Sequence, residues 1–459
     1  MSEDRRRRVL AAADRLEHVS RLPHDELLRL QADELRRLLQ HAASYSDWWR
    51  RYISDVNVDA VTPMEMLAGI PVTTREFVQQ HLDDMVVTVP GIPSTDYPVQ
   101  KTSGSGGRPV QVVKYWPHYS VVVDAITILE WRWHRRDLSK RIGLFRLGAD
   151  AEDTVLPGPP LTYLGDMPPL FSRSSVDSTV DELLDALVRF QPGYLLTNPI
   201  TLRLVALEQL RSPRPISPID QVMTLADRVS PELRELTRQA LGARIVDRYS
   251  SVEFNVIALQ CPVHDHLHQI VPNVHIEVLD EYDQPVPLGQ PGRAVITGLQ
   301  GAATPLLRYE LGDIITLGDQ SCDTGITWPV ISDVHGRVRS SAIGADGSRK
   351  LVTLFTADFL HMRQIREFRL VRFDDGAIVV VHVDEALDDT QRTRLITSIQ
   401  RDVFREPLQV TVLESRLPLT PPRWKVREIY FLTGNRDPHW TADDIDQLLA
   451  GVDTAVEQF

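Results

Sequence analysis

The chain has 459 residues, which is too long for one compact core and sufficient for two or three domains. Its hydrophobic content of 42% and charged content of 25% are those of an ordinary soluble globular protein, and no apolar run approaches the roughly 20 residues of a membrane helix. The net charge of −13 argues against general nucleic-acid binding, which requires a basic surface.

The N-terminal region is predicted to be helical over residues 5–42, because leucines recur at helical spacing among arginines and carboxylates. Pro23 interrupts this pattern. The first 19 residues lack the apolar core and the cleavage site of a secretion signal, so we expect an amphipathic helix and a cytoplasmic location. Residues 61–90 predict a loop and then a helix capped by Thr73 or Thr74.

The middle of the chain alternates short apolar segments with helical patterns from residue 108 to 250, which predicts an α/β region with a largely parallel sheet. Residues 268–318 have the composition of strands and turns. After about residue 337, two strands, a helix and another strand predict a small α+β domain.

The predicted fold class is therefore α/β: a large N-terminal multi-sheet α/β domain and a small α+β C-terminal domain, joined by a hinge near residues 336–340. We assign residues 1–336 to the first domain, with a helical start at 1–60, and residues 337–459 to the second.

A loop of small residues separates two apolar, strand-like runs near residue 105. Its members are Thr102, Ser103, Gly104, Ser105, Gly106 and Gly107. Backbone N–H groups and hydroxyls in such a loop can bind phosphate, although a simple Ser/Gly turn has the same composition. The Gly-Lys-Ser/Thr ending of a Walker loop and the GxGxxG pattern are both missing.

Four further segments contain residue types that suit nucleotide chemistry. "VDRYSSVEF" (246–254) places Tyr249 and Glu253 after a strand, where a ring can stack on a base and a carboxylate can reach a metal ion. "LLRYELGD" ends in Asp313, a carboxylate that can accept ribose hydroxyls. "HGRVRS" lies at the domain joint, and Lys425 is one of only five lysines. Each segment alone is equally well explained as an ordinary turn or strand end.

In their order and spacing these segments resemble the adenylate-forming superfamily of acyl-CoA synthetases, peptide-synthetase adenylation domains and luciferases. "GIPVTTREFV" (69–78) and "TPLLRYELGD" (304–313) are most similar to the phenylacetate–CoA ligase branch. The resemblance spans about residues 25–432.

This resemblance implies an ATP-dependent enzyme that activates a carboxylic acid as an acyl-adenylate and transfers the acyl group to a thiol such as CoA. A carrier-protein thiol, an amine acceptor and a non-catalytic nucleotide-binding homologue remain as alternatives.

The resemblance also implies roles for individual residues in ATP binding. The loop Thr102–Gly107 would surround the β- and γ-phosphates, and Tyr249 would stack on adenine, with Ser250 beside it. Asp313 would bind the ribose hydroxyls with support from Arg337. The backbone of residues 224–228 would follow the base edge, including Ala226 and Asp227.

Two residues are implied to take part in the chemistry. Glu253 would hold Mg²⁺, and Lys425 would be carried by the mobile C-terminal domain to the α-phosphate and the substrate carboxylate. Because the attacking carboxylate and the phosphates are both anionic, the reaction requires such cations.

The chain departs from the family pattern at several positions. Gly106 and Arg108 stand where relatives often have Thr and Lys, Ser250 replaces a Gly, and Ser340 replaces the hinge Asp. Trp424 replaces a small residue before the lysine. The stretch "SSAIGADGSRKLVT" replaces a glycine-rich segment of many CoA ligases, which weakens the case for CoA as the acceptor.

The two cysteines lie in segments that resemble a zinc site found in part of this branch. Cys261, His268 and Cys322 match its pattern, but Thr324 stands at the fourth ligand position. His264, His266 or Asp323 would then complete a structural Zn²⁺ site. Two core thiols beside a solvated histidine cluster are the alternative.

The partners expected from the sequence are a small carboxylic acid and its acyl acceptor, with no nucleic acid and no membrane span. The segment "WRW" (131–133) suggests an aromatic acid without identifying it. A homodimer is left open.

Overall fold

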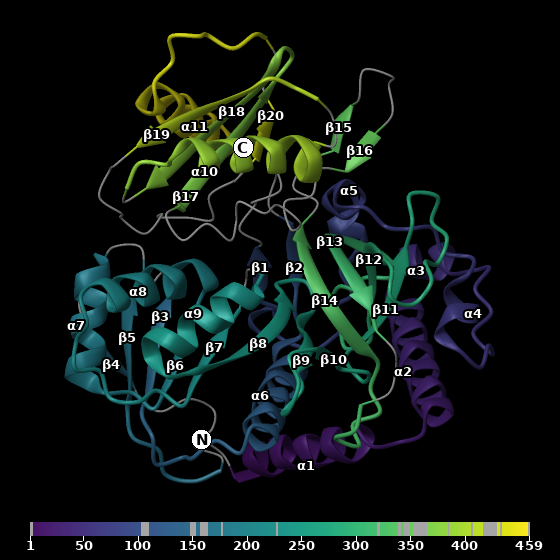
Figure 1. Ribbon diagram of the computed structural model, residues 1–459. Helices are drawn as coiled ribbons and strands as arrows, with labels where there is room; N and C mark the ends of the chain where they lie inside the picture. Colours follow the sequence, from purple (N-terminus) through teal and green to yellow (C-terminus); the bar gives the residue numbers. More distant parts are fainter. Residues whose placement is uncertain are drawn as a thin grey trace. The chain divides into compact units, whose positions relative to one another are not determined.

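The computed structural model of the chain is shown in Figure 1. It describes residues 3–101, 110–146, 153–156, 164–175, 178–225, 228–318, 322–337, 341–343, 349–351, 365–383, 385–404, 407–415, 429–431 and 434–457. The chain divides into two compact units, of which the first contains most of residues 1–335 and the second consists mainly of the residues from Gly336 onward. Among the helices in these ranges, none is long and apolar enough to cross a membrane.

The first unit begins with five helices, of which the leucine spacing predicts the first two, separated at Pro23, and the threonine cap predicts the fifth. Their bounds are α1 Glu3–Val19, α2 His24–Tyr45, α3 Asp47–Tyr52, α4 Pro63–Leu67 and α5 Arg75–Met85. The side chain of Thr74 caps α5 by accepting a hydrogen bond from the backbone N–H of Phe77, so the second of the two predicted caps is the one used. Leu35 and Leu39 of α2 are completely buried in the core of this unit.

A continuous sheet of 12 strands forms the centre of the first unit (Figure 1). Its order is β11-β12-β13-β14-β10-β9-β8-β7-β6-β3-β5-β4. One half is antiparallel, with β9 Asn255–Gln260, β10 Leu267–Gln269, β11 Val274–Leu279, β12 Pro291–Gly298, β13 Tyr309–Leu317 and β14 Val330–Arg337. Loops and hairpins connect these strands, in agreement with the strand-and-turn composition.

The other half of the sheet is largely parallel, which confirms the prediction from the alternating pattern. Its strands are β3 Ile142–Arg146, β4 Thr154–Leu156, β5 Leu170–Ser174, β6 Tyr194–Thr197, β7 Gln221–Thr224 and β8 Arg244–Ser251. The helices that accompany them are α6 Trp116–Trp133, α7 Val180–Phe190, α8 Pro199–Arg211 and α9 Pro231–Leu241. β8 joins the two halves, since it pairs with β7 in parallel and with β9 in antiparallel.

The strands beside the small-residue loop are not part of this large sheet. β1 Val99–Lys101 and β2 Gln111–Val113 form a separate antiparallel pair, with Lys101 opposite Gln111. The loop residues between them lie outside the described ranges.

The second unit is a small α+β structure built on four strands in the order β19-β18-β17-β20. Its described elements are β15 Ser341–Ile343, β16 Arg349–Leu351, β17 Ile365–Phe373, β18 Gly376–Val383, α10 Asp389–Ser398, a π-helical turn at Ile399–Phe404, β19 Val410–Ser415, β20 Ile429–Phe431 and α11 Ala442–Glu457. Every residue of β18 is buried, because α10 and α11 contribute apolar side chains to separate core clusters on this sheet. These elements agree with the predicted α+β fold.

Candidate functional site

Two tyrosine–carboxylate pairs join the end of β8 to β13 in the first unit. The phenol of Tyr249 donates a hydrogen bond of 2.8 Å to Asp313, and the phenol of Tyr309 donates one of 3.2 Å to Glu253. All four side chains are buried. The fold therefore brings together three residues that the sequence predicts for the site: Tyr249, Glu253 and Asp313.

A register shift and a left-handed residue in the backbone set the directions of these side chains. A register shift between Tyr249 and Ser250 interrupts the pairing of β8 with β9, which is a common device for redirecting side chains near functional sites. Gly312 has a φ of 85° immediately before Asp313. This left-handed conformation strains any residue with a Cβ, and it explains why a glycine precedes the aspartate.

Arg308 fixes the start of β13 although its own φ is 46°, a value that non-glycine residues adopt only under constraint. Its guanidinium makes two 3.0 Å hydrogen bonds to Glu277 and a third of 2.6 Å to the carbonyl of Ile70. The backbone of Thr73 pairs with the backbone on both sides of Tyr309. The two segments that carry the family resemblance, 69–78 and 304–313, are therefore in direct contact.

A buried ion cluster anchors the strand that carries Tyr249. Glu130 of α6 forms an ion pair with Arg248 of β8. Its other carboxylate oxygen lies 3.4 Å from the guanidinium of Arg136. Burial alone would raise the pKa of Glu130, but the charges of Arg248 and Arg136 outweigh it and hold the pKa at about 2. Glu130 is thus ionised, and it connects α6 to β8 next to the site.

Lys114 directly follows β2, and its ammonium group lies beside Glu253. Its Nζ donates a hydrogen bond of 2.5 Å to the main-chain carbonyl of Glu253 and lies 4.8 Å from the centre of the Tyr119 ring. Only 6% of the residue is exposed. Burial lowers the pKa of Lys114 to about 8, although the charge of Glu253 opposes part of this decrease.

The carboxylate of Glu253 has the chemistry to hold a divalent cation such as Mg²⁺. Its Oε1 accepts the bond from Tyr309, while its buried Oε2 has no hydrogen-bond partner among the residues that the structure describes. A buried carboxylate oxygen without a donor is unfavourable unless a cation or a water molecule contacts it. Glu253 therefore fits the predicted magnesium ligand.

Several predicted site residues lie outside the described ranges. They are the phosphate-loop residues Thr102–Gly107, the base-edge residues Ala226 and Asp227, and the catalytic lysine Lys425. For Arg337 only the backbone is described, as the last residue of β14. Their roles stay predictions.

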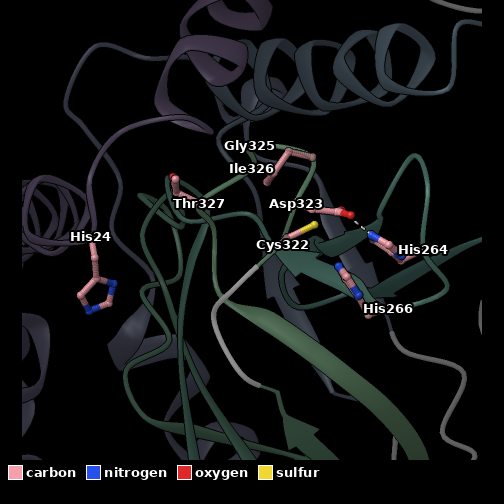
Figure 2. Close-up of a pocket in the computed structure, with 8 residues that line it drawn as sticks. All are labelled: His24, His264, His266, Cys322, Asp323, Gly325, Ile326 and Thr327. Carbon is pink, nitrogen blue, oxygen red and sulfur yellow. Dashed lines mark hydrogen bonds and ion pairs between the residues drawn. The ribbon is translucent and has the colours of Figure 1, made fainter.

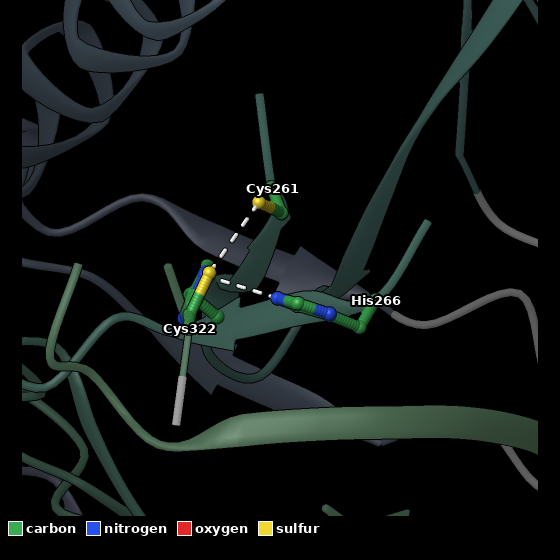
Figure 3. A group of neighbouring side chains, drawn as sticks. Cys261, His266 and Cys322 are labelled. Atoms are coloured by element: carbon green, nitrogen blue, oxygen red, sulfur yellow. Dashed lines mark hydrogen bonds between the residues drawn. The ribbon is translucent and has the colours of Figure 1, made fainter. Parts of the chain in front are cut away.

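A second site consists of Cys261, His266, His268 and Cys322, which we call the Cys–His cluster. One potential ligand atom from each residue lies within 4.8 Å of all the others. Figure 3 shows Cys261, His266 and Cys322 converging from the β9–β10 region and from the segment before β14. Of the three alternatives for a fourth ligand, His266 is the one that joins the predicted three.

Two of the donor separations in the Cys–His cluster agree with those of a tetrahedral zinc site. The two sulfur atoms are 3.8 Å apart, and the Nε2 atoms of His266 and His268 are 3.3 Å apart. Tetrahedral zinc with Zn–S of ~2.3 Å and Zn–N of ~2.0 Å places sulfurs about 3.8 Å and nitrogens about 3.3 Å from one another. The cluster thus has donor types that suit zinc, and these two separations agree with tetrahedral coordination.

Surrounding groups hold the Cys–His cluster in this arrangement. His268 Nδ1 lies 3.0 Å from the carbonyl of Trp328, so that it donates its proton there and leaves Nε2 available to a metal. The guanidinium of Arg244 donates to the carbonyls of Cys261, Pro262 and His264, and thereby fixes the loop after β9. Burial lowers the pKa of His268 to about 4 and raises that of the Cys261 thiol.

A hollow of about 740 Å³ leads to the Cys–His cluster from the surface (Figure 2). His266 and Cys322 line it together with His24, Gly325, Ile326 and Thr327. His264 and Asp323 also face it and are joined by a hydrogen bond of 2.6 Å. The hollow supplies a path by which a metal ion or a chelator can reach the cluster.

The chain shares its fold with solved structures of CoA ligases. A crystal structure of 2-hydroxyisobutyryl-CoA ligase in the postadenylation state, in complex with R3-HIB-AMP, matches 96% of this chain and 94% of that chain, with a TM-score of 0.70 and 15% identity. A benzoate CoA ligase from Burkholderia xenovorans matches 74% of this chain and 69% of that one, with a TM-score of 0.52 and 13% identity.

Among curated proteins, a phenylacetate–coenzyme A ligase from Thermus thermophilus is 24% identical over 332 residues, which are 69% of this chain and 71% of that protein. This similarity agrees with the resemblance that the motifs indicate. No protein-family model matches the chain.

Sequence reasoning assigned no role to Lys114 or Tyr309, and it left His266 as one of three alternatives. Tyr309 lies four residues before Asp313 on β13, but Gly312 between them has a φ of 85° and the pairing with β12 shifts register there, so strand alternation gives no signal for Tyr309. For Lys114, the only signal is the rarity of lysine in the chain. Its contact with Glu253 spans 139 positions and depends on the tertiary fold.

Proposed function

We propose that the protein is an AMP-forming carboxylate ligase. In this proposal it activates a carboxylic acid with ATP as an acyl-adenylate and then transfers the acyl group to CoA. The observation that carries the proposal is the pair of buried carboxylates, Asp313 and Glu253, each bonded to a tyrosine where β8 and β13 meet. They lie in a fold shared with CoA ligases over most of the chain.

The roles of these residues follow from their chemistry. Asp313 accepts hydrogen bonds from the two ribose hydroxyls, and the phenol of Tyr249 orients its carboxylate. The ring of Tyr249 covers the adenine. Glu253 presents its Oε2 to Mg²⁺, which when bound neutralises charge on the phosphates as the acid attacks the α-phosphorus.

The remaining parts of the proposed mechanism rest on the resemblance alone. Residues Thr102–Gly107 bind the β- and γ-phosphates, Ala226 and Asp227 follow the base edge, and Arg337 supports the ribose. Lys425 brings a positive charge to the α-phosphate when the C-terminal domain moves. A cytoplasmic location is part of the same proposal.

ATP–pyrophosphate exchange over a panel of aryl and short aliphatic acids tests this function directly. We expect exchange with at least one acid, AMP release when CoA is added, and loss of exchange in Lys425→Ala. Measurable ATP binding without exchange for any acid would instead favour a non-catalytic nucleotide-binding protein. Exchange without CoA-dependent AMP release would indicate a carrier-protein thiol or an amine as the acceptor.

We further propose that the Cys–His cluster binds one structural Zn²⁺ through Cys261, His266, His268 and Cys322. The support is the agreement of its sulfur and nitrogen separations with tetrahedral geometry and the bond that fixes His268. All four positions are filled by protein atoms, which is typical of structural and not of catalytic zinc. Metal analysis of protein purified without chelators is expected to find one zinc per chain.

A further inference from the structure

Lys114 is unusual because it is a buried lysine beside the carboxylate that fits the metal ligand. Lysine is rarely buried without compensation, since removing an ammonium group from water is costly. Here the carbonyl of Glu253 accepts one hydrogen bond, and the face of Tyr119 lies near the charge. Both contacts stabilise a positive charge at this position.

The surrounding cavity is small. Lys114, Tyr119, Glu253 and Thr304 line a space of about 20 Å³. This volume is sufficient for about one water molecule. Mg²⁺ normally retains several of its waters, and such a hydrated ion needs more room than this. A metal ion at Glu253 must therefore share a restricted space with the Lys114 ammonium group.

We propose that Lys114 acts as a built-in cation that competes with the divalent metal ion for Glu253. The ammonium group holds Glu253 in place through its main-chain carbonyl, and Lys114 lines the same cavity as this residue, so that its charge acts on the carboxylate. A second cation at that carboxylate is repelled, so that this chain binds the metal weakly until the phosphates of a nucleotide add negative charge. The inference rests on the proposed function, because it takes Glu253 as the metal ligand.

Manganese provides the probe, because free Mn²⁺ is measured directly by electron paramagnetic resonance without any turnover. Lys114→Met removes the charge and retains the length of the side chain. We expect it to bind Mn²⁺ about 10-fold or more tightly than the wild type in the absence of ATP, because a repelling charge has been removed. Lys140→Met is the matched control, since Lys140 forms a half-exposed ion pair with Asp220. It should leave the affinity unchanged.

A double-mutant cycle with Glu253→Gln tests whether the effect acts through Glu253. In that background, Lys114→Met should no longer increase Mn²⁺ affinity. Unchanged or weaker Mn²⁺ binding by folded Lys114→Met in the presence of an intact Glu253 overturns the proposal. An increase that persists in the double variant overturns it as well.

A measurement on the wild type covers the case in which the variant does not fold. Mn²⁺ should displace the ammonium group and increase the labelling of Lys114 by an amine reagent, relative to Lys140. Labelling that Mn²⁺ does not change contradicts competition. If ATP–pyrophosphate exchange fails while the Mn²⁺ affinities of the variants are as expected, the proposed function is rejected and the competition at Glu253 is still supported.

Discussion

The Cys–His cluster and the Glu253 centre are two candidate metal sites in the same unit, and they differ in the type and number of their donor atoms and in the charge beside them. The cluster contains four donors from soft or neutral groups that lie within 4.8 Å of one another. The Glu253 centre offers one hard carboxylate and has a lysine ammonium group beside it. The first arrangement suits a permanent zinc ion, whereas the second suits a hard cation that arrives together with a nucleotide.

Because of this difference, we expect one site to contribute to the stability of the protein and the other to its catalytic turnover. Zinc in the cluster would connect the β9–β10 region to the segment before β14, so that its loss should affect folding. A metal ion at Glu253 would join this one side chain to the reacting nucleotide, so that its loss should affect catalysis and leave the fold intact. The predictions below test whether the two sites can be separated in this way.

The largest expected effect is on stability, from Cys261→Ser. This variant should lose its zinc, and its free energy of unfolding should fall by more than about 3 kcal/mol, because metal binding at a structural site is folding energy. Thermal unfolding with metal analysis of the same samples measures both. The thermal midpoint should fall by about 5 °C or more.

Two neighbouring histidines provide a matched pair of variants, one in the cluster and one outside it as the control. His266→Ala should lose zinc, whereas His264→Ala should retain it, because His264 pairs with Asp323 and is not part of the four-residue cluster. Zinc retained in His266→Ala but lost from His264→Ala would show that the ligand set is wrong.

The next largest effect is on the rate, from Glu253→Gln. This change keeps the shape of the side chain and removes its charge, so ATP–pyrophosphate exchange should fall about 100-fold or more. Zinc content and thermal midpoint should stay close to those of the wild type. A wild-type rate at ordinary or excess Mg²⁺ would remove Glu253 from the metal site.

A buried histidine away from both sites should make the protein sensitive to acid. His275 of β11 lies 3.2 Å from the side-chain oxygen of Gln31 through Nδ1, and burial lowers its pKa to about 4. The unfolded chain binds this proton near pH 6.5, so stability is greatest above that pH and falls as the pH decreases from 6.5 to 4. The loss from this residue is at most about 3 kcal/mol.

Chemical denaturation of the wild type and of His275→Gln at pH 7 and at pH 5 measures this contribution. The variant should lose less stability between the two values. Zinc content is followed in parallel, because acid also protonates the cluster histidines. An equal loss in both proteins would show that His275 does not contribute to the sensitivity.

The sequence predicts the helices, the alternating α/β pattern and the identity of Tyr249, Glu253 and Asp313, because each depends on local spacing or on a contiguous motif. It does not predict which residues of different segments touch. The bonds from Tyr249 to Asp313 and from Lys114 to Glu253 join positions 64 and 139 residues apart. The position of His266, the proposed fourth ligand, likewise depends on the path of the β9–β10 loop, which Arg244 fixes from β8.

The smallest effect comes from Tyr249→Phe, which removes the hydroxyl and keeps the ring. The hydrogen bond to Asp313 is charge-assisted, and its loss should cost about 1.5 kcal/mol in ATP binding, or about a 10-fold increase in KM for ATP. Stacking on the adenine should survive, so kcat should change little. Tyr249→Ala should increase KM further, because it also removes the ring. A change confined to kcat in Tyr249→Phe would place Tyr249 with the reacting groups at Glu253 and contradict its assignment to the ribose and the base.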